Sequence, residues 1–197
     1  MKLIITRHGE TEENKQGILQ GHLPGKLSAE GKIQAKKVAL RLKDEKIDFI
    51  FSSDLRRAAD TAQEIAKFHP AVTIEYTREL RERNMGEFEG KKKSELGWSA
   101  KEFKAIILQP QKGETMEQVY DRAKSLIQKV YSDHPNDTVL FVGHNGINKS
   151  LIAAITDKKH DQIKTIETQH NTSINEFEIA EDGKHEIRVL NCIKHLD

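Results

Sequence analysis

The strongest constraint on the fold is an alternation of short apolar segments with longer stretches of helical periodicity. Four segments are typical of buried strands and lie at residues 3–6, 47–53, 72–76 and 138–143. Helical periodicity follows them at 27–46, 54–68, 114–134 and 146–155. The segments 174–180 and 185–193 are typical of a closing antiparallel hairpin with its turn at 181–184. This pattern predicts an α/β three-layer sandwich with a mostly parallel, mixed sheet.

Composition restricts the domain count and the class of partner. A chain of 197 residues suits a single domain over 1–197, which would bury roughly 70% of its unfolded surface. Lysine and arginine (32) nearly balance aspartate and glutamate (31), so neither a nucleic-acid partner nor a membrane partner is expected. Cys192 is the only cysteine, and no apolar run approaches the roughly 20 residues of a spanning helix. Because charge and a strand come too early for a signal peptide, we predict a cytoplasmic protein.

Charged side chains follow the ends of the predicted strands. Arg7 and His8 follow the first strand, Arg57 follows the second, and His144 follows the fourth. Glu82 lies in the segment after the third strand. Ligands of open α/β sheets bind beyond the carboxyl ends of the strands, so these side chains are predicted to meet. Since a cation at a helix start is unfavourable unless an anion lies in front of it, the meeting point is predicted to bind an anion.

The residue types at this point favour phosphate chemistry. Arginine forks match phosphate oxygens, and a neutral imidazole can attack phosphorus. The sequence contains no GxxxxGK[ST], HExxH or CxxC motif, so no metal or cofactor is expected. A metallohydrolase that uses His8 and His144 as ligands stays an alternative.

Four ordered segments, LIITRHGETEEN, SSDLRRAADTA, ELRERNMGEFEG and VGHNG, extend from Leu3 to Gly146. In order and spacing they closely resemble the histidine phosphatase superfamily, the phosphoglycerate mutase-like family. The resemblance implies a phosphoglycerate mutase-like fold and a metal-independent phosphomonoesterase that forms a phosphohistidine. The implied substrate is a small phosphorylated metabolite, such as a sugar phosphate, a phosphoglycerate, a cobalamin-precursor phosphate or phosphoserine.

The resemblance also implies roles for individual residues. His8 matches the nucleophile, Glu82 the proton donor, and the phosphoryl group is cradled by Arg7, Arg57 and His144. Arg56 is the weaker candidate because the motif aligns Arg57. Substrate contacts are implied for Thr11, Asn14, Gln20, Gly21 and Asn145. Many members carry glycine directly after the second histidine, whereas this chain has Asn145 and then Gly146. Close backbone approach at this point is therefore an open question.

Two alternatives to a phosphatase share this pocket. One is a cofactor-dependent phosphoglycerate mutase, and the other is a catalytically inactive phosphate-binding regulatory module. The irregular, lysine-rich segment 86–113 is interpreted as a lid-like excursion over the sheet edge. The family's mutases are usually longer and carry a larger insertion there, so the short segment favours the phosphatase.

Overall fold

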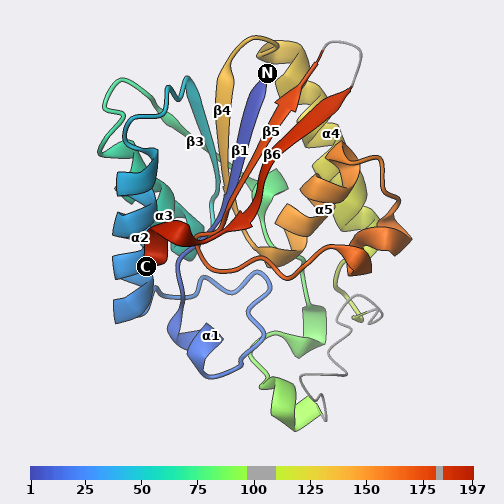
Figure 1. Ribbon diagram of the computed structural model, residues 1–197. Coiled ribbons are helices and arrows are strands. Elements are labelled where there is room, and N and C mark those ends of the chain that lie inside the picture. The colour runs from blue at the N-terminus through green and yellow to red at the C-terminus, as the bar shows by residue number, and fades with distance from the viewer. Residues whose placement is uncertain (97–109, 181–183) are drawn as a thin grey trace.

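The computed structural model describes residues 1–96, 110–180 and 184–197, and the strands in this part of the chain form one sheet (Figure 1). The strands are β1 (Lys2–Arg7), β2 (Phe49–Ser53), β3 (Ile74–Thr77), β4 (Thr138–Gly143), β5 (Ile174–Ile179) and β6 (His185–Cys192). The α-helices are α1 (Glu12–Lys15), α2 (Ala29–Leu42), α3 (Arg56–Ala66), α4 (Met116–Asp133) and α5 (Asn145–Ile155). Short 3₁₀ helices lie at Arg78–Leu80, Gly86–Phe88, Lys93–Leu96, His160–Thr165 and Lys194–Leu196.

The sheet is mixed and mostly parallel, as the sequence predicted. The strand order is β3-β2-β4-β1-β5-β6. The pairs β2–β3, β2–β4 and β1–β4 are parallel, whereas β1–β5 and β5–β6 are antiparallel. The predicted closing hairpin is confirmed in its two strands, and residues 181–183 of its turn lie outside the described residues.

Helices cover both faces of the sheet, which gives the predicted three layers. In Figure 1, α2 and α3 lie on one side and α4 and α5 on the other. Successive residues of β1 alternate between the layers, because side chains of a strand point to opposite faces. Leu3 and Ile5 pack against α4 and α5, and Ile4 packs against α2 and α3. Both faces of the central strands are therefore buried, which explains their continuous apolar sequence.

Capping residues define where the longer helices begin. The Ser28 side chain accepts a hydrogen bond from the Gly31 amide, which confirms it as the N-cap of α2. Thr115 and Gln118 form a reciprocal capping box at the start of α4. The sequence placed α2 from Ser28 and its apolar face, and it placed α4 from its apolar face alone.

The structure differs from the sequence prediction in several details, and the third strand, expected at 72–76, is observed at Ile74–Thr77. The first strand continues to Arg7, because Arg7 pairs in register with Gly143 of β4. The second strand begins at Phe49, where its register with β4 starts. Helix α1 was not predicted, since it is a single four-residue turn capped by Thr11 and lacks buried residues.

Of the described parts of the predicted excursion, residues 86–96 lie beside the loop that follows α1, and residues 110–113 lie beside Gly86 and Glu87. The Leu19 amide donates to the carbonyl of Lys91, and the Lys93 amide donates to the carbonyl of Gly17. This pairing brings Lys93 to the carboxyl ends of the parallel strands. Residues 97–109, the middle of the expected lid, lie outside the described residues.

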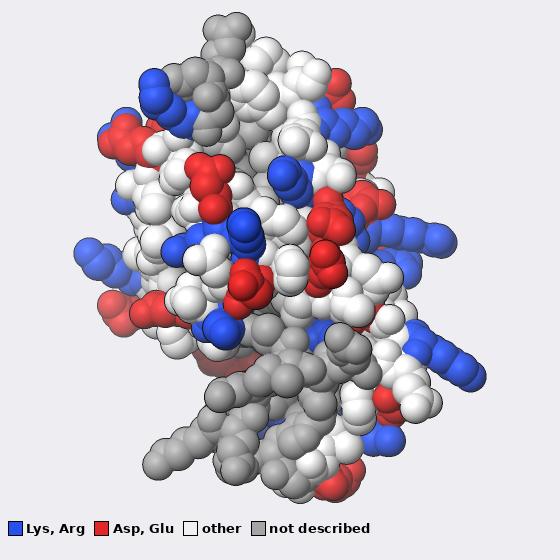
Figure 2. Space-filling view, turned by 90° about the vertical axis from the view of Figure 1, so that its right-hand side faces the viewer, with Lys and Arg blue, Asp and Glu red and all other residues white. Residues whose placement is uncertain are grey.

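The outer surface mixes the two signs of charge. Figure 2 shows lysine and arginine interspersed with aspartate and glutamate over the face that it presents. Among the helices that the structure describes, none is long and apolar enough to cross a membrane.

Candidate active site

A cavity of about 190 Å³ opens at the carboxyl ends of the parallel strands. Its size is below the roughly 300–1,000 Å³ of sites for drug-sized ligands, which suits a small metabolite. Both polar and apolar side chains form its wall. The lining residues are Arg7, His8, Asn14, Ile18, Leu19, Gln20, Gly21, Arg57, Glu82, Arg83, Met85, Lys93, Met116, Asn145, Gly146, Lys149, Ile163 and Thr168.

His8 is held as a neutral imidazole with one defined tautomer. Its side chain lies 2.7 Å from the carbonyl oxygen of Gly9 through Nδ1. Because a carbonyl only accepts, Nδ1 carries the proton and Nε2 keeps its lone pair. Burial lowers the pKa of His8 well below its ordinary value, and the charges of Arg57 and Arg7 lower this pKa further. The ring is therefore in the form that a nucleophile requires.

Arg7 presents one edge of its guanidinium toward the cavity. Its Nη1 donates to the carbonyl oxygen of Gln169 at 2.6 Å. Its Nε is buried and has no hydrogen-bond partner among the described residues. Burial lowers the pKa of Arg7, and the Glu82 carboxylate opposes this shift. An anion that accepts from Nε would complete the hydrogen bonding of the arginine fork.

Arg57 is buried and connects the start of α3 to the loop after α1. Its Nη2 donates to the Gly21 carbonyl at 2.8 Å, and its Nη1 donates to the Leu23 carbonyl. Burial lowers the pKa of Arg57 to about 10, so its charge persists at neutral pH. The neighbouring Arg56 is exposed and lies 3.7 Å from Asp60. The structure thus brings Arg57, and not Arg56, into the site.

His144 lies behind the cavity wall. The Nε of Arg57 donates to its Nδ1 at 3.1 Å, so Nε2 carries the proton and faces the Ser53 hydroxyl at 2.9 Å. The rings of His144 and His8 are 5.0 Å apart between centroids. Both nitrogens of His144 therefore have protein partners in this arrangement, and the ring does not line the cavity. Its direct contact with a phosphoryl group stays a prediction that requires Nε2 to leave Ser53.

The carboxylate of Glu82 contacts the backbone at the start of α5. Its Oε1 accepts hydrogen bonds at 2.9 Å from the backbone amides of Gly146 and Arg83, and its Oε2 lies 3.1 Å from the Gly146 amide. These contacts give α5 the cap that its own N-cap residue, His144, does not provide. The carboxylate is thus fixed at the cavity by the backbone of two different segments.

The departure from the family motif at Asn145 and Gly146 has a structural answer. A Cβ added at Gly146 would lie 2.4 Å from Oε1 of Glu82. The backbone at Gly146 therefore approaches the Glu82 carboxylate closely, and the glycine that permits this lies one residue later than in the usual motif. Asn145 lines the cavity, and its Oδ1 accepts from the Gln169 amide at 2.9 Å. This bond fixes the side-chain amide so that Nδ2 remains as a donor.

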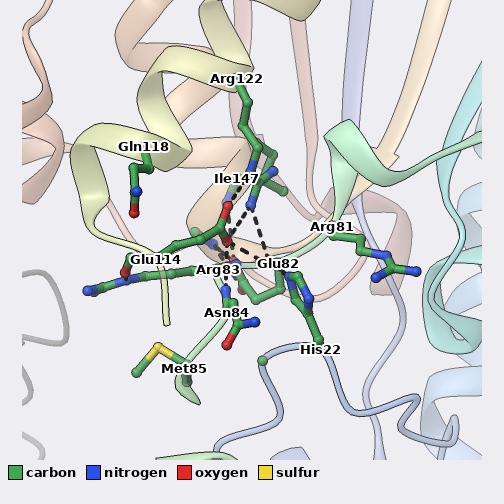
Figure 3. A network of polar contacts seen from close by, with 12 residues as sticks. His22, Arg81, Glu82, Arg83, Asn84, Met85, Glu114, Gln118, Arg122 and Ile147 are labelled. Carbon is green, nitrogen blue, oxygen red and sulfur yellow. Dashed lines mark hydrogen bonds and ion pairs between the residues drawn. The ribbon is translucent and has the colours of Figure 1, made fainter. Parts of the chain in front are cut away.

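A polar network supports the backbone of Glu82 (Figure 3). The Nε2 of His22 donates to the Glu82 carbonyl at 2.8 Å, and Nη2 of Arg122 donates to it at 3.2 Å. Arg122 also pairs with Glu114 at 2.8 Å. Burial raises the pKa of Glu114, but the hydrogen bond and charge of Arg122, together with the Asn84 amide and His22, outweigh burial, and this pKa lies below its ordinary value. Arg81 points away from the network and pairs with Asp54.

Two of the predicted substrate contacts come from the capping box of α1. Oδ1 of Asn14 accepts from the Thr11 amide, so Nδ2 of Asn14 remains as a donor at the cavity wall. Thr11 itself is fully buried and does not line the cavity. Its hydroxyl accepts from the Asn14 amide and from Nε2 of Gln20 at 2.8 Å. Thr11 therefore positions Asn14 and Gln20, which line the wall beside Gly21, and forms no part of the wall itself.

Several residues of the site carried no sequence signal. Gln169 contacts Arg7 and Asn145 only through its backbone. Because nearly every residue type carries the same backbone groups, these contacts do not depend on the residue being glutamine. The Lys149 side chain, by contrast, repeats four residues after Asn145 on α5, and this helical spacing could have indicated a shared face. Within the described residues, no group of three or more His, Cys, Asp or Glu side chains is arranged to hold a metal ion.

The sequence matches the Histidine phosphatase superfamily (branch 1) over residues 3–192, and the chain belongs to this family. It is 33% identical to phosphoglycerate mutase-like protein 4 of Arabidopsis thaliana, over 100% of this chain and 87% of that relative. It is 36% identical to phosphoserine phosphatase 1 of Hydrogenobacter thermophilus, over 79% of this chain and 76% of that relative. The solved phosphoserine phosphatase of Entamoeba histolytica in complex with 3-phosphoglyceric acid superposes with a TM-score of 0.85 and 28% identity, over 99% of this chain and 98% of that one. The phosphoglycerate mutase-like fold is thereby confirmed.

The buried histidines make stability depend on pH. Burial, and after it Arg57, lowers the pKa of His144 well below 6.5. Below about pH 6.5 the unfolded chain binds a proton that the folded ring refuses, so stability falls as pH falls. We expect His144→Gln to reduce the slope of unfolding free energy against pH by up to about 1.4 kcal/mol per pH unit below pH 6. Urea titrations of both proteins between pH 5 and 8 measure this, and parallel curves would contradict it.

Proposed function

We propose that the chain hydrolyses small phosphorylated metabolites through a phosphohistidine on His8, without a metal ion. Membership of the histidine phosphatase superfamily and the phosphatase names of its relatives make the chain a phosphoric monoester hydrolase. The observation that carries the mechanism is the state of His8. Its lone pair at Nε2 lies at a cavity whose wall includes the buried Arg57, the partly buried Arg7 and the carboxylate of Glu82.

The first chemical step transfers the phosphoryl group to the enzyme. Nε2 of His8 forms a bond to phosphorus while the ester P–O bond breaks, and the leaving oxygen takes a proton from Glu82. In the second step water attacks the phosphohistidine and the P–N bond breaks. Glu82 accepts the proton from this water, which returns the site to its starting state. Every proton and phosphoryl group is accounted for by substrate, water and these two side chains.

Fixed cations supply the electrostatic stabilisation in this proposal. Phosphoryl transfer depends mostly on positioning and on charges aimed at the equatorial oxygens. Arg57 is buried and Arg7 is partly buried, and backbone carbonyls hold both of them in place. Little reorganisation is therefore required when the charge of the transition state develops.

The cytoplasmic location expected from the sequence stays a prediction.

Phosphate release tests this proposal against a mutase. In excess chelator, we expect release of inorganic phosphate from at least one small phosphomonoester to exceed isomerisation of 3-phosphoglycerate by about tenfold or more. The isomerisation assay contains catalytic 2,3-bisphosphoglycerate, and phosphate release is followed over a panel of metabolites. The physical reason is that segment 86–113 is shorter in sequence than the insertion expected of the family's mutases, so we expect water to reach the intermediate.

Each other outcome assigns a different function. Isomerisation faster than phosphate release on every substrate would replace the phosphatase with a mutase and keep the His8 intermediate. Activity that disappears in chelator and returns with zinc or magnesium would favour the metallohydrolase. Phosphate binding without any turnover would identify the inactive regulatory module.

A further inference from the structure

Gln169 lies behind Arg7, in the loop that joins the 3₁₀ helix His160–Thr165 to β5. Its backbone faces the site, because its carbonyl accepts from Nη1 of Arg7 at 2.6 Å and its amide donates to Oδ1 of Asn145 at 2.9 Å. Its side chain is 2% exposed and faces the sheet, where its Oε1 accepts from Nδ2 of Asn175 at 2.8 Å. Gln169 therefore connects the interior of the sheet to the anion-binding edge of the site.

Asn175 is a fully buried polar residue of β5, in register with Ile5 of β1. Its Nδ2 donates to the Ile5 carbonyl at 3.2 Å as well as to Gln169, and its Oδ1 accepts from the Asn191 amide of β6 at 2.8 Å. Turning this side chain would leave buried polar groups unpaired, which is costly. The strands on both sides of β5 thus fix the orientation of Asn175, and Asn175 fixes the side chain of Gln169.

Asn191 connects the same loop to β6 through an unusual backbone conformation. Its φ is +47°, in the left-handed region that asparagine adopts more readily than most residues with a side chain. It lies where the register between β5 and β6 is irregular, and such irregularities redirect side chains. Its Nδ2 donates to the carbonyl of Thr168 at 3.1 Å. The backbone directly before Gln169 is therefore held by β6.

Two further contacts hold the loop against the end of β1. The Thr172 amide donates to the Arg7 carbonyl at 3.1 Å, and Nδ2 of Asn171 donates to the His8 carbonyl at 3.0 Å. Thr172 has a φ of +55°, which is a strained conformation for a β-branched residue. Strain of this kind persists only where the surrounding structure holds it, and it is concentrated at functional sites.

We propose that Gln169, Asn175 and Asn191 are positioning residues that set the orientation of the Arg7 guanidinium. This inference rests on the proposed phosphatase function, in which Arg7 binds the phosphoryl group. The Nε of Arg7 is buried and has no hydrogen-bond partner among the described residues, so it is the donor that an anion can use. Because a guanidinium is planar and rigid, the carbonyl that holds Nη1 restricts the direction of Nε. The Gln169 backbone makes that contact, and its side chain determines where the backbone lies.

Gln169→Ala tests the inference, because it removes the side chain and keeps the backbone groups that contact Arg7. We expect kcat/KM for phosphomonoesters to fall by about 5- to 30-fold, since a small displacement of a group that orients the reacting phosphoryl group is costly. Asn175→Leu, which removes the amide that holds Gln169, should cause a similar fall. Val38→Ala, at a buried core position of α2, should keep kcat/KM near the wild-type value and controls for a general loss of stability.

A double-mutant cycle with Arg7→Ala separates positioning from a purely structural role. If Gln169 acts through Arg7, Gln169→Ala should change kcat/KM of the Arg7→Ala protein by less than about twofold. The dissociation constant of inorganic phosphate, measured by calorimetry on the same four proteins, should show the same non-additivity without requiring turnover. Equal losses in both backgrounds would overturn the inference, as would a wild-type kcat/KM in Gln169→Ala.

Asn191→Gly is a second variant, which decides the question if Gln169→Ala does not fold. Glycine adopts a positive φ without steric cost, so this change removes only the contacts of the side chain. We expect a smaller fall in kcat/KM than in Gln169→Ala, and it should disappear in the Arg7→Ala background. A fall of unchanged size in that background would contradict the positioning role.

The two readouts separate this inference from the proposed function. Absence of turnover on every phosphomonoester, with the non-additive effect on phosphate binding intact, would reject the proposed function alone. Turnover of phosphomonoesters with additive losses in the cycle would reject the positioning role alone.

Discussion

His8→Ala is expected to lower kcat by at least about 10⁴-fold on every phosphomonoester that the enzyme hydrolyses. Removing the nucleophile of an enzyme with a covalent intermediate leaves only binding and electrostatic stabilisation. The Nδ1 contact to Gly9 leaves Nε2 as the attacking atom, and the nearby ring of His144 has protein partners on both of its nitrogens. Rapid-quench measurements of phosphate release would determine the loss.

Direct detection of the intermediate complements the kinetic result. Wild-type protein that is mixed briefly with substrate and quenched in base should carry one acid-labile, base-stable phosphoryl group on His8. The exposed His170 provides a matched control, and His170→Ala should retain both the label and the turnover. If His8→Ala keeps turnover near the wild-type rate, water attacks phosphorus directly and the assignment of His8 as nucleophile is wrong.

The sequence predicted the parts of this site that depend on side-chain chemistry. His8, Arg57 and Glu82 could be found because a nucleophile, a phosphate fork and an acid require particular residue types at strand ends. The three layers followed from the periodicity of apolar residues, and Ser28 followed from capping chemistry. Each of these signals belongs to the residue that carries out the role.

The contacts that orient those residues were less visible. Gln169 holds Arg7 and Asn145 through backbone atoms, which leave no trace in residue type. His22 was left as an ordinary histidine because its partner is the backbone carbonyl of Glu82, sixty residues away in sequence. Thr11 was assigned to substrate contact, yet it caps α1, since a motif does not separate a residue that contacts substrate from one that positions its neighbours.

Glu82 both accepts hydrogen bonds at the start of α5 and is the proposed general acid for the leaving group. Its carboxylate accepts the Gly146 and Arg83 amides, so in the acidic form one oxygen must carry a proton and give up acceptor contacts. We expect Glu82→Gln to slow hydrolysis of alkyl phosphates by about 10²–10⁴-fold, because general acid catalysis of a strongly basic leaving oxygen is lost. The loss on nitrophenyl phosphate should be much smaller, since that leaving oxygen is a weak base and departs without a proton.

Gly146→Ala is the matched test of position, because it leaves the carboxyl group in the chain. The added methyl would lie 2.4 Å from Oε1 of Glu82 and must displace this side chain. Displacing a general acid should reproduce the same dependence on the leaving group, with a smaller loss on alkyl phosphates than Glu82→Gln. Plots of log kcat/KM against leaving-group pKa for the three proteins measure this: both variants should give steeper slopes than wild type. Parallel plots, with equal losses on alkyl and nitrophenyl phosphates, would instead assign Glu82 to substrate binding or to capping of α5.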